Sequence, residues 1–566
     1  MRLSNLIYST LILATTAISA QAQETKTTDK KKEEKTINEE IEVVRPYKPV
    51  LAEAVKLRRS PDLNDNKTYK AKFNYTLTER KLELNSDINK LQAQQLTDEQ
   101  RAELINNYLK AGFGSATTTL AEGYFSNGRD EALQVGAFFR HFGQEGKLIG
   151  QKYNQQQLSV FGRSIADQAT FSGKLNYQRN GTYFYGLDQN NLPVNFNPEK
   201  QSFNFIEAEG EVVNKFSPDP DALSYAAKIN GYLWNDKFSA KENAIIINGY
   251  VNKRISTFNL GLAAGADFGS TKDALRSVSN NILRLNPYIR LQTNGVNITA
   301  GINFVQEFGT VSTSRIFPAV TADFTVIPDY LQLFGEVKGD VNRTSMKQLT
   351  DDNPFLNNNI EIKNSIEKLS ISAGIKGTGG PGFGYKIKAY HKEITDMPLF
   401  VNNFSAANKF DVIYDFGTMK LTGIEGQISV QVSDDLNWTG GLILEQYKPS
   451  SETESWYKPT ARVNSNLRYN FNKQLSFDAA VAIQGQSKAK LYTSAPASPY
   501  VLPNTSLERV VNVKGFVDLG VGANYQINTK FSVFLKANNL LNTENARYLY
   551  YQAIGVNVFG GLTYSF

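Results

Sequence analysis

The sequence predicts an all-β protein: a closed antiparallel transmembrane β-barrel of about 22 strands, with a short N-terminal segment that is periplasmic or lumenal. Three observations predict this fold. The chain of 566 residues opens on an export signal, alternating apolar and polar residues fill it from residue 107 onward, and an amphipathic strand ends on Phe566. A closed barrel suits lipid because closure leaves no strand edge unpaired.

Residues 1–22 are predicted to be a secretory signal peptide. Met1 and Arg2 supply the positive start, Leu6 to Ile18 form a short apolar core, and Ala20-Gln21-Ala22 is an A-x-A cleavage site. The mature chain is therefore expected to begin at Gln23. An uncleaved membrane anchor is the alternative, but the apolar core is short for a spanning helix.

Two further segments precede the barrel. Residues 23–40 are dense in Lys and Glu and are expected to form a flexible leader. Residues 41–106 are too short for a large core of their own. Their basic residues form a candidate patch that contacts the lumen or an anionic partner, with a solvated periplasmic stretch as the alternative: Arg45, Lys48, Lys56, Arg58, Arg59, Lys67 and Lys70.

The barrel is expected over residues 107–566. Its segments alternate with a period of two, as in 475–484, 511–525 (read as one long strand) and 531–537. The second face carries Lys, Asp, Glu and Gln, which suits a wet lumen. A large soluble sandwich or propeller is the alternative, but its inner faces would be more uniformly apolar.

Short and long connections alternate along this region, which is typical of short periplasmic turns and long extracellular loops. The expected short turns are 166–168, 252–254, 293–294, 328–330, 433–435 and 528–530. The expected long loops are 270–281, 341–367, 393–409, 487–508 and 538–555.

The C-terminal strand is interpreted as the assembly signal. Leu562, Tyr564 and Phe566 share one apolar face, and the chain ends on the aromatic residue. Such a strand closes the barrel against the first one. We therefore expect outer-membrane lipid and the barrel-assembly machinery as partners, and the cell outer membrane as the location.

Several stretches resemble the barrel of TonB-dependent receptors, especially plug-poor relatives found in Bacteroidetes. The resemblance covers most of residues 107–566 and rests on stretches in the order of that family: Tyr108 to Ser115, Glu122-Gly123-Tyr124, Phe139 to Gly143, Asp415-Phe416-Gly417, Leu421 to Gly426 and Lys536 to Asn542.

The resemblance implies ligand uptake across the outer membrane and a barrel of similar strand number. The chain departs from the family because only residues 41–106 stand where a larger plug domain would be. Ile41, Glu42, Val43 and Val44 could form a TonB box, an extended segment that adds a strand to a TonB-type partner. An ordinary strand or a lumen-anchoring segment is the alternative.

Catalysis and metal binding find little support. The sequence has no Cys and only two histidines, His141 and His391, neither beside a nucleophile motif. We expect no enzyme activity, cofactor or metal site. The charge of +6 is scattered, which argues against nucleic-acid binding. Two loop features stay open. The stretch 351–359 is expected either to bind calcium or a sugar or to be a flexible polar loop. Tyr548, Tyr550 and Tyr551 are expected either to stack on a ligand or to belong to an aromatic girdle.

Two functions follow. The first is a receptor-like barrel that takes up a ligand. The second is a non-transporting scaffold subunit of a multiprotein outer-membrane complex. A TonB-type partner is expected for the first function, and lipoprotein partners are expected for the second. A barrel of this size needs something in its lumen: the N-terminal segment, inward-folded loops or another protein.

Overall fold

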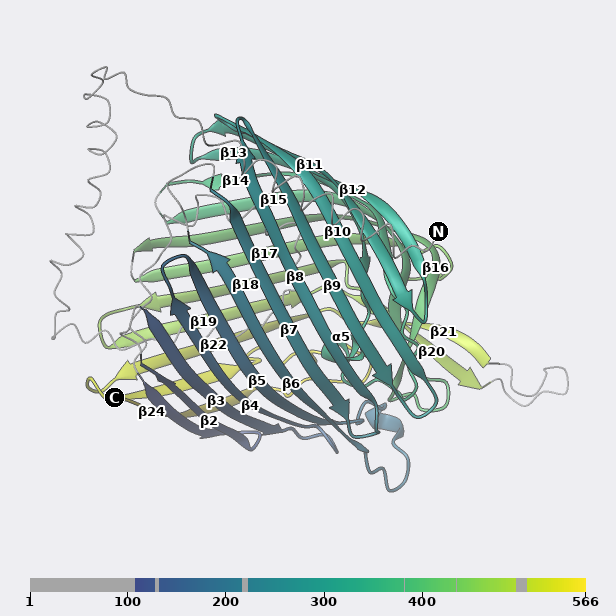
Figure 1. Ribbon diagram of the computed structural model, residues 1–566. Helices are drawn as coiled ribbons and strands as arrows, with labels where there is room; N and C mark the ends of the chain where they lie inside the picture. Colours follow the sequence, from purple (N-terminus) through teal and green to yellow (C-terminus); the bar gives the residue numbers. More distant parts are fainter. Residues whose placement is uncertain (1–106, 128–131, 216–221, 381, 434, 495–505) are drawn as a thin grey trace, which may run out of the picture. The chain divides into compact units, whose positions relative to one another are not determined.

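The computed structural model describes residues 107–127, 132–215, 222–380, 382–433, 435–494 and 506–566, and most of these residues form a closed β-barrel. Twenty-two strands make one sheet, and each pairs antiparallel with its neighbours (Figure 1). Strand β1 (Tyr108–Gly114) pairs with β2 (Thr118–Ser126) on one side and with β24 (Asn557–Ser565) on the other. The prediction of a closed barrel of about 22 strands is therefore confirmed.

The remaining strands follow in chain order. They are β3 (Leu133–Glu145), β4 (Lys152–Ile165), β5 (Ala169–Tyr183), β6 (Lys200–Asn214), β7 (Ser224–Asp236), β8 (Lys241–Ile255), β9 (Phe258–Lys272), β10 (Ser277–Thr293), β11 (Val296–Gly309), β12 (Thr313–Ile327), β13 (Leu331–Asn342), β14 (Ser365–Thr378), β15 (Phe383–Asn402), β16 (Phe410–Ser433), β17 (Leu436–Lys448), β18 (Ala461–Asn470), β19 (Leu475–Gln484), β22 (Phe516–Gln526) and β23 (Phe531–Asn538).

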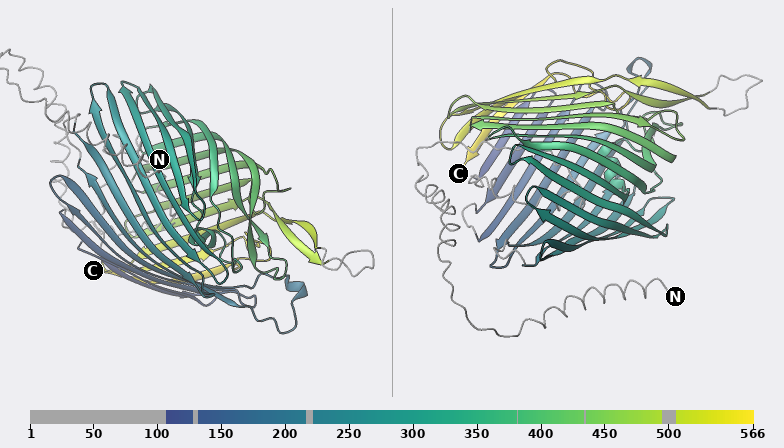
Figure 2. Two further views of the ribbon diagram at one scale, coloured as in Figure 1. Left: turned by 45° about the vertical axis from the view of Figure 1, so that its right-hand side comes forward. Right: turned by 90° about the horizontal axis from the view of Figure 1, so that it is seen from above.

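Three elements lie outside this sheet. Strands β20 (Ser487–Ser494) and β21 (Ser506–Val513) form a separate hairpin that projects from one end of the barrel (Figure 2). A 3₁₀ turn, η2 (Gln189–Asn191), lies between β5 and β6. Helix α5 (Met346–Asp352) lies between β13 and β14. No helix of the described residues is long and apolar enough to cross a membrane.

Side chains alternate between the two faces of the wall. On β23, Leu535 points outward and is 56% exposed, while its neighbour Phe534 is 4% exposed. On β1, Phe113 is 72% exposed and Tyr108 is 1% exposed. Large apolar side chains repeat on the outer face of nearly every strand, where lipid solvates them, and the inner face is polar. The protein is therefore an outer-membrane barrel.

The barrel closes between its first and last strands. Gly112 lies opposite Gly561, and the backbone N–H of Phe566 donates to the carbonyl of Asn107 over 2.9 Å. Asn107 and Phe566 lie at the rim of the barrel that also carries the short turns, so this rim is periplasmic. Aromatic rings gather there: Phe566 lies 6.1 Å from Phe125 and 5.6 Å from Tyr564 between ring centroids.

Several expected boundaries are wrong. The expected long loop 270–281 is mostly strand, since β9 and β10 leave only residues 273–276 as the turn. The expected turn 252–254 lies within β8, and the turn is 256–257. The long strand expected over 511–525 is two strands, because Lys514 and Gly515 separate β21 from β22. The described parts of the expected loop 487–508 belong to the β20–β21 hairpin, and β15 extends into 393–402. Amphipathic strand patterns continue past the membrane here, so alternation alone does not show where lipid ends.

Candidate functional site: the lumen and its loop cap

A polar cavity of about 1890 Å³ occupies the barrel interior. Basic and acidic side chains line it in nearly equal number. They come from β3 to β7, β9, β10, β12 to β16 and β22, and from loops 343–364 and 539–556. Many of them form ion pairs between strands, such as Lys376 on β14 with Asp323 on β12 at 2.7 Å and Lys388 on β15 with Glu425 on β16 at 2.8 Å. The alternation that sends Val and Leu to lipid also sends these charges into the lumen.

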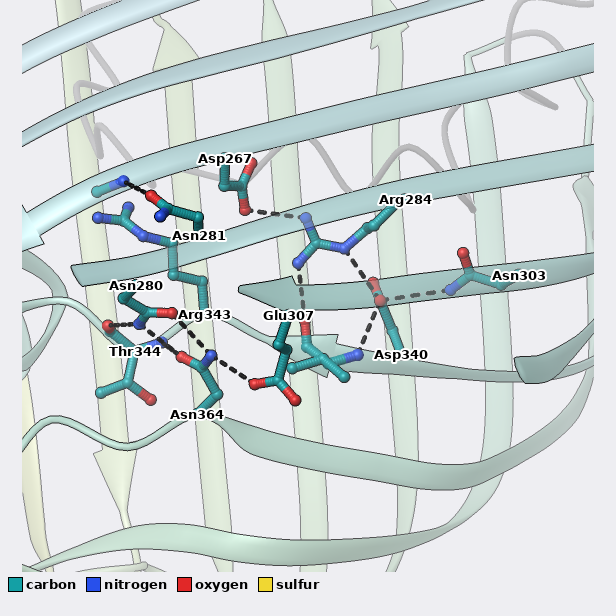
Figure 3. Close-up of polar contacts among 12 residues, drawn as sticks. Asp267, Asn280, Asn281, Arg284, Asn303, Glu307, Asp340, Arg343, Thr344 and Asn364 are labelled. Carbon is teal, nitrogen blue, oxygen red and sulfur yellow. Dashed lines mark hydrogen bonds and ion pairs between the residues drawn. The ribbon is translucent and has the colours of Figure 1, made fainter. Parts of the chain in front are cut away.

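One arginine joins several strands of the wall (Figure 3). Arg284 on β10 pairs with Asp267 on β9 at 2.9 Å and with Asp340 on β13 at 3.0 Å. Its third nitrogen donates to the carbonyl oxygen of Val341 over 2.7 Å. Asn303 on β11 also donates to Asp340, over 3.3 Å. The guanidinium donors are thus directed at fixed acceptors, which holds the start of the following loop against the wall.

Residues 343–364 form a loop that turns into the lumen, where α5 is seen inside the ring of strands (Figure 1). Ser345 caps this helix, because its hydroxyl accepts from the N–H of Gln348 over 3.1 Å. The helix lies against the wall through Met346, Leu349 and Thr350, which are all buried. This loop fills part of the lumen from the extracellular side.

Glu242 on β8 anchors the loop at the helix start. Its carboxylate accepts from the N–H of Met346 over 2.6 Å and from the hydroxyl of Thr271 over 2.9 Å. It also accepts from the Tyr232 hydroxyl over 2.5 Å, and that hydroxyl accepts from Arg343 over 3.0 Å. The Glu242 side chain is fully buried, so the cation and these donors offset the loss of hydration.

A second tie joins the two ends of the same loop to the wall (Figure 3). Asn280 on β10 donates to the carbonyl oxygen of Thr344 over 3.2 Å and to the side-chain oxygen of Asn364 over 2.7 Å. Asn364 donates in turn to Glu307 on β11 over 2.9 Å. Glu307 is also paired with Arg315 on β12. The loop is therefore fixed at both ends.

An aromatic cluster covers the extracellular mouth, and we call it the loop cap. Its core comes from residues of 184–199, 343–364, 449–460 and 539–556 together with the strand ends that they meet, and loop 403–409 joins it through the hydrogen bonds of Asn408. Phe355 stacks on Tyr551 with centroids 3.5 Å apart, and Phe410 lies 5.2 Å from Tyr548. Trp456 is 1% exposed. The five loops begin at strands spaced around the barrel, so their packing spans its mouth.

Hydrogen bonds connect cap loops that are distant in sequence. The Tyr548 hydroxyl donates to the carbonyl oxygen of Asp352 over 2.7 Å, and Asn408 donates to that of Phe184 over 2.7 Å. The Tyr551 hydroxyl donates to the carbonyl oxygen of Asn408. Burial raises the pKa of Tyr548 and Tyr551, so both hydroxyls stay protonated as donors.

The tyrosine prediction is corrected by these contacts. Tyr548 is 4% exposed and Tyr551 is 5% exposed, so neither presents a free ring to a ligand or to lipid. They are core residues of the loop cap. The stretch 351–359 is likewise partly helix and partly buried, with Asn353 at 0% exposure. Among the described residues, no group of three or more His, Cys, Asp or Glu side chains is placed to hold a metal ion.

The other residues singled out in the sequence fall into three groups. Ile41, Glu42, Val43, Val44, Arg45, Lys48, Lys56, Arg58 and Arg59 lie outside the described residues. Leu562, Tyr564 and Phe566 lie at the end of β24, where Leu562 faces lipid and Phe566 ends the chain at the periplasmic rim. His141 and His391 lie on β3 and β15 and contact Thr119, Gln156 and Thr422.

Solved structures share this fold. No described protein family and no curated protein matches the sequence. The siderophore receptor PirA from Acinetobacter baumannii superposes with a TM-score of 0.58 at 12% identity, over 81% of this chain and 80% of that chain. The chain has the fold of outer-membrane receptor barrels.

Two Pseudomonas aeruginosa structures lead to the same fold. The ferric enterobactin receptor PfeA superposes with a TM-score of 0.57 at 12% identity, over 81% of each chain. FpvA bound to a heterologous pyoverdine gives 0.56 at 13% identity, over 81% of this chain and 71% of that chain. At these identities the likeness concerns the fold.

Sequence reasoning missed Glu242, Arg343 and the loop cap. One local signal was present: Ser345 and Gln348 form the S-x-x-Q pattern of a capping box at the start of α5. The partners of Glu242 come from three separate segments, so no spacing along the chain identifies them.

Proposed function

We propose that this protein is a receptor-type barrel that takes up a polar ligand across the outer membrane. The observation that carries the proposal is the lumenal cavity of about 1890 Å³, which is lined by charged and amide side chains. Such a wall hydrates a polar solute, whereas the outer face of the same strands repels it. The shared fold with siderophore and ferric enterobactin receptors supports uptake as the activity.

The loop cap serves as the gate in this proposal. A ligand from outside meets the packed core of Phe355, Phe410 and Tyr551 before it reaches the lumen. Loop 343–364 must leave its anchor on Glu242 for the path to open. Ligand binding would supply the free energy for this change only if the ligand binds the open state more tightly.

Solute entry into proteoliposomes tests the gate. We expect vesicles with the wild-type protein to resist swelling in small sugars, and vesicles with Glu242→Ala to swell. Glu209→Ala is the matched control, because Glu209 pairs with Lys228 at 2.9 Å in the same lumen without touching the loop. Equal swelling in all three, or none in any, would remove the gate from the proposal.

A scaffold function is the second candidate, and the loop cap favours it. A mouth closed by a buried aromatic core suits a barrel that never opens. This function predicts partner proteins, lipoproteins among them, that co-purify in fixed ratio with the tagged protein in mild detergent. Purification of the barrel alone would favour uptake.

Energy coupling is a separate proposal and rests on the sequence. Ile41 to Val44 would add a strand to a TonB-type partner, and a proline within a strand removes one of the hydrogen bonds that hold it. Val43→Pro should then abolish uptake, while Val43→Ile should preserve it. Equal uptake by both variants would show that these residues are not a TonB box.

A further inference from the structure

A small recess in the lumenal wall lies where the barrel closes. It has a volume of about 340 Å³ and is lined from β1, β2 and β3, from β17 to β19, and from β22 to β24. It is distinct from the larger cavity, although Arg140 and Asn538 line both. Gly520 and Gly522 place no side chain on this part of the wall, which leaves the hollow.

The charges of the recess are unbalanced. Of the described residues, four basic ones line it, Lys110, Arg140, Arg468 and Lys536, against two carboxylates. Both carboxylates already have partners. Glu122 accepts from the Tyr108 hydroxyl over 2.9 Å and pairs with Arg140 at 3.8 Å. Asp478 pairs with Arg468 at 3.8 Å and accepts from Asn524 over 3.4 Å.

Lys110 and Lys536 are left over. Within the described part of the chain, neither ammonium has a carboxylate oxygen within the 4.0 Å of an ion pair. The Lys110 ammonium instead lies 4.1 Å from the centroid of the Phe534 ring. The charge of Lys536 repels it, while Glu122 and Asp478 attract it from beyond ion-pair distance. Elsewhere in the lumen Lys376, Lys388 and Lys392 each pair with a carboxylate at 2.7 to 3.1 Å.

A neutral donor adds to the two cations. Ser476 lies in the wall of the recess at 0% exposure, and its hydroxyl has no hydrogen-bond partner among the residues that the structure describes. An unpaired buried hydroxyl and two like charges in one concave site are each unfavourable on their own. A compact anion bound between the lysines would relieve the repulsion and could accept from Ser476 after a small shift of the wall.

We propose that this recess is a binding site for a compact doubly charged anion of the phosphate type. Lys110 and Lys536 would supply the charge, and Arg140 and Arg468 would complete a positive wall. Concave walls of one charge sign concentrate counter-ions. The site goes beyond the proposed uptake, because the recess would bind the anion whether or not the barrel transports anything.

Calorimetric titration of the intact protein with inorganic phosphate at low ionic strength tests the site. We expect one saturable site per chain. Lys110→Gln with Lys536→Gln should weaken binding at least about tenfold, because two charge-assisted contacts are lost. The matched control is Lys376→Gln with Lys388→Gln, which removes the same charge from the lumen and should stay within about twofold of wild type.

Three results would overturn the proposal. One is the absence of saturable phosphate binding by folded wild-type protein. Another is equal loss in the control, which would show only the general charge of the lumen. The third concerns the acidic residues that precede β1. If phosphate binds only after Asp98→Asn, Glu99→Gln and Glu103→Gln in the full chain, the recess holds the chain's own carboxylates and not a separate anion.

Discussion

Glu242 is the residue on which the position of loop 343–364 depends most. Its buried carboxylate meets the first N–H of α5, two hydroxyl groups and Arg343. Removal of one partner from a buried charge pair costs about 3–5 kcal/mol, because the other charge stays unpaired. The arginine would then lose the Glu242 carboxylate that lies 3.8 Å from it.

We therefore predict that Glu242→Ala releases the loop. Trypsin should cleave after Lys347 and Lys363, which the wild-type cap shields or partly shields. Limited proteolysis followed by mass spectrometry of the fragments measures this. Glu209→Ala should leave the fragment pattern unchanged. Resistance of Glu242→Ala equal to that of wild type would contradict the anchor.

Lys458 gives a prediction that depends on pH. The residue is half-buried in the loop cap, and burial lowers the pKa of its ammonium, with Asp352 opposing this shift and Arg547 adding to it. A pKa below that of the unfolded chain means that the protonated lysine destabilises the folded cap. This penalty is fully present at neutral pH and disappears as pH rises toward the unfolded pKa of about 10.4.

Samples can be heated at pH 7 to increasing temperatures before electrophoresis. Lys458→Met should accordingly raise the temperature at which the band of the folded barrel is lost. The gain over wild type should shrink at pH 10. A variant that is less stable at pH 7, or a gain that grows with pH, would show that the charged amine stabilises the cap.

Closure of the barrel depends on the pairing of β1 with β24, which we call the seam. A Cβ on Gly561 would lie 1.9 Å from the carbonyl oxygen of Ala111 on the paired strand, which is a backbone atom that cannot move away alone. Gly441, in the middle of β17, has no atom within 4 Å of the same position. These two glycines are therefore a matched pair for one substitution.

Gly561→Ala should impair closure, and Gly441→Ala should be tolerated. The share of protein that shows heat-modifiable mobility in outer-membrane fractions measures closure. Normal folding of Gly561→Ala would mean that β1 and β24 adjust their register at little cost, and the seam would then not limit closure.

The terminal aromatic residue belongs to the same strand. We predict that deletion of Phe566 reduces the folded barrel in the outer membrane, because the assembly machinery would read this end of β24. Phe471→Ala is the control, since Phe471 is also an exposed aromatic, 61% exposed beside a short turn. Pulse-chase measurement of folding separates the two. Equal rates for both variants would leave the C-terminal signal unsupported.

The strands could be predicted from sequence because each one carries its own alternation, as 531–537 does. The loop cap could not. Tyr548 and Tyr551 look the same in sequence whether they face lipid, ligand or a core, and their burial depends on Phe355 and Phe410, far away in the chain. The same holds for Glu242, whose partners come from separate elements.

The whole molecule combines two opposed features: a wide polar lumen and a packed extracellular mouth. Uptake requires the cap to open, whereas a scaffold requires it to stay shut. The absence of cysteine from the chain makes this distinction measurable, because any introduced thiol is unique. Asn248 on β8 lines the lumenal cavity, and Val194 lies in an extracellular loop at 93% exposure.

Labelling of intact cells with a membrane-impermeant maleimide tests the central claim most directly. Val194→Cys should react in every background. Asn248→Cys should react from outside only when combined with Glu242→Ala, because only then does the loop leave the mouth. Reaction of Asn248→Cys in an otherwise wild-type barrel would show an open mouth. Failure to react even with Glu242→Ala would show that the loop cap is not the barrier.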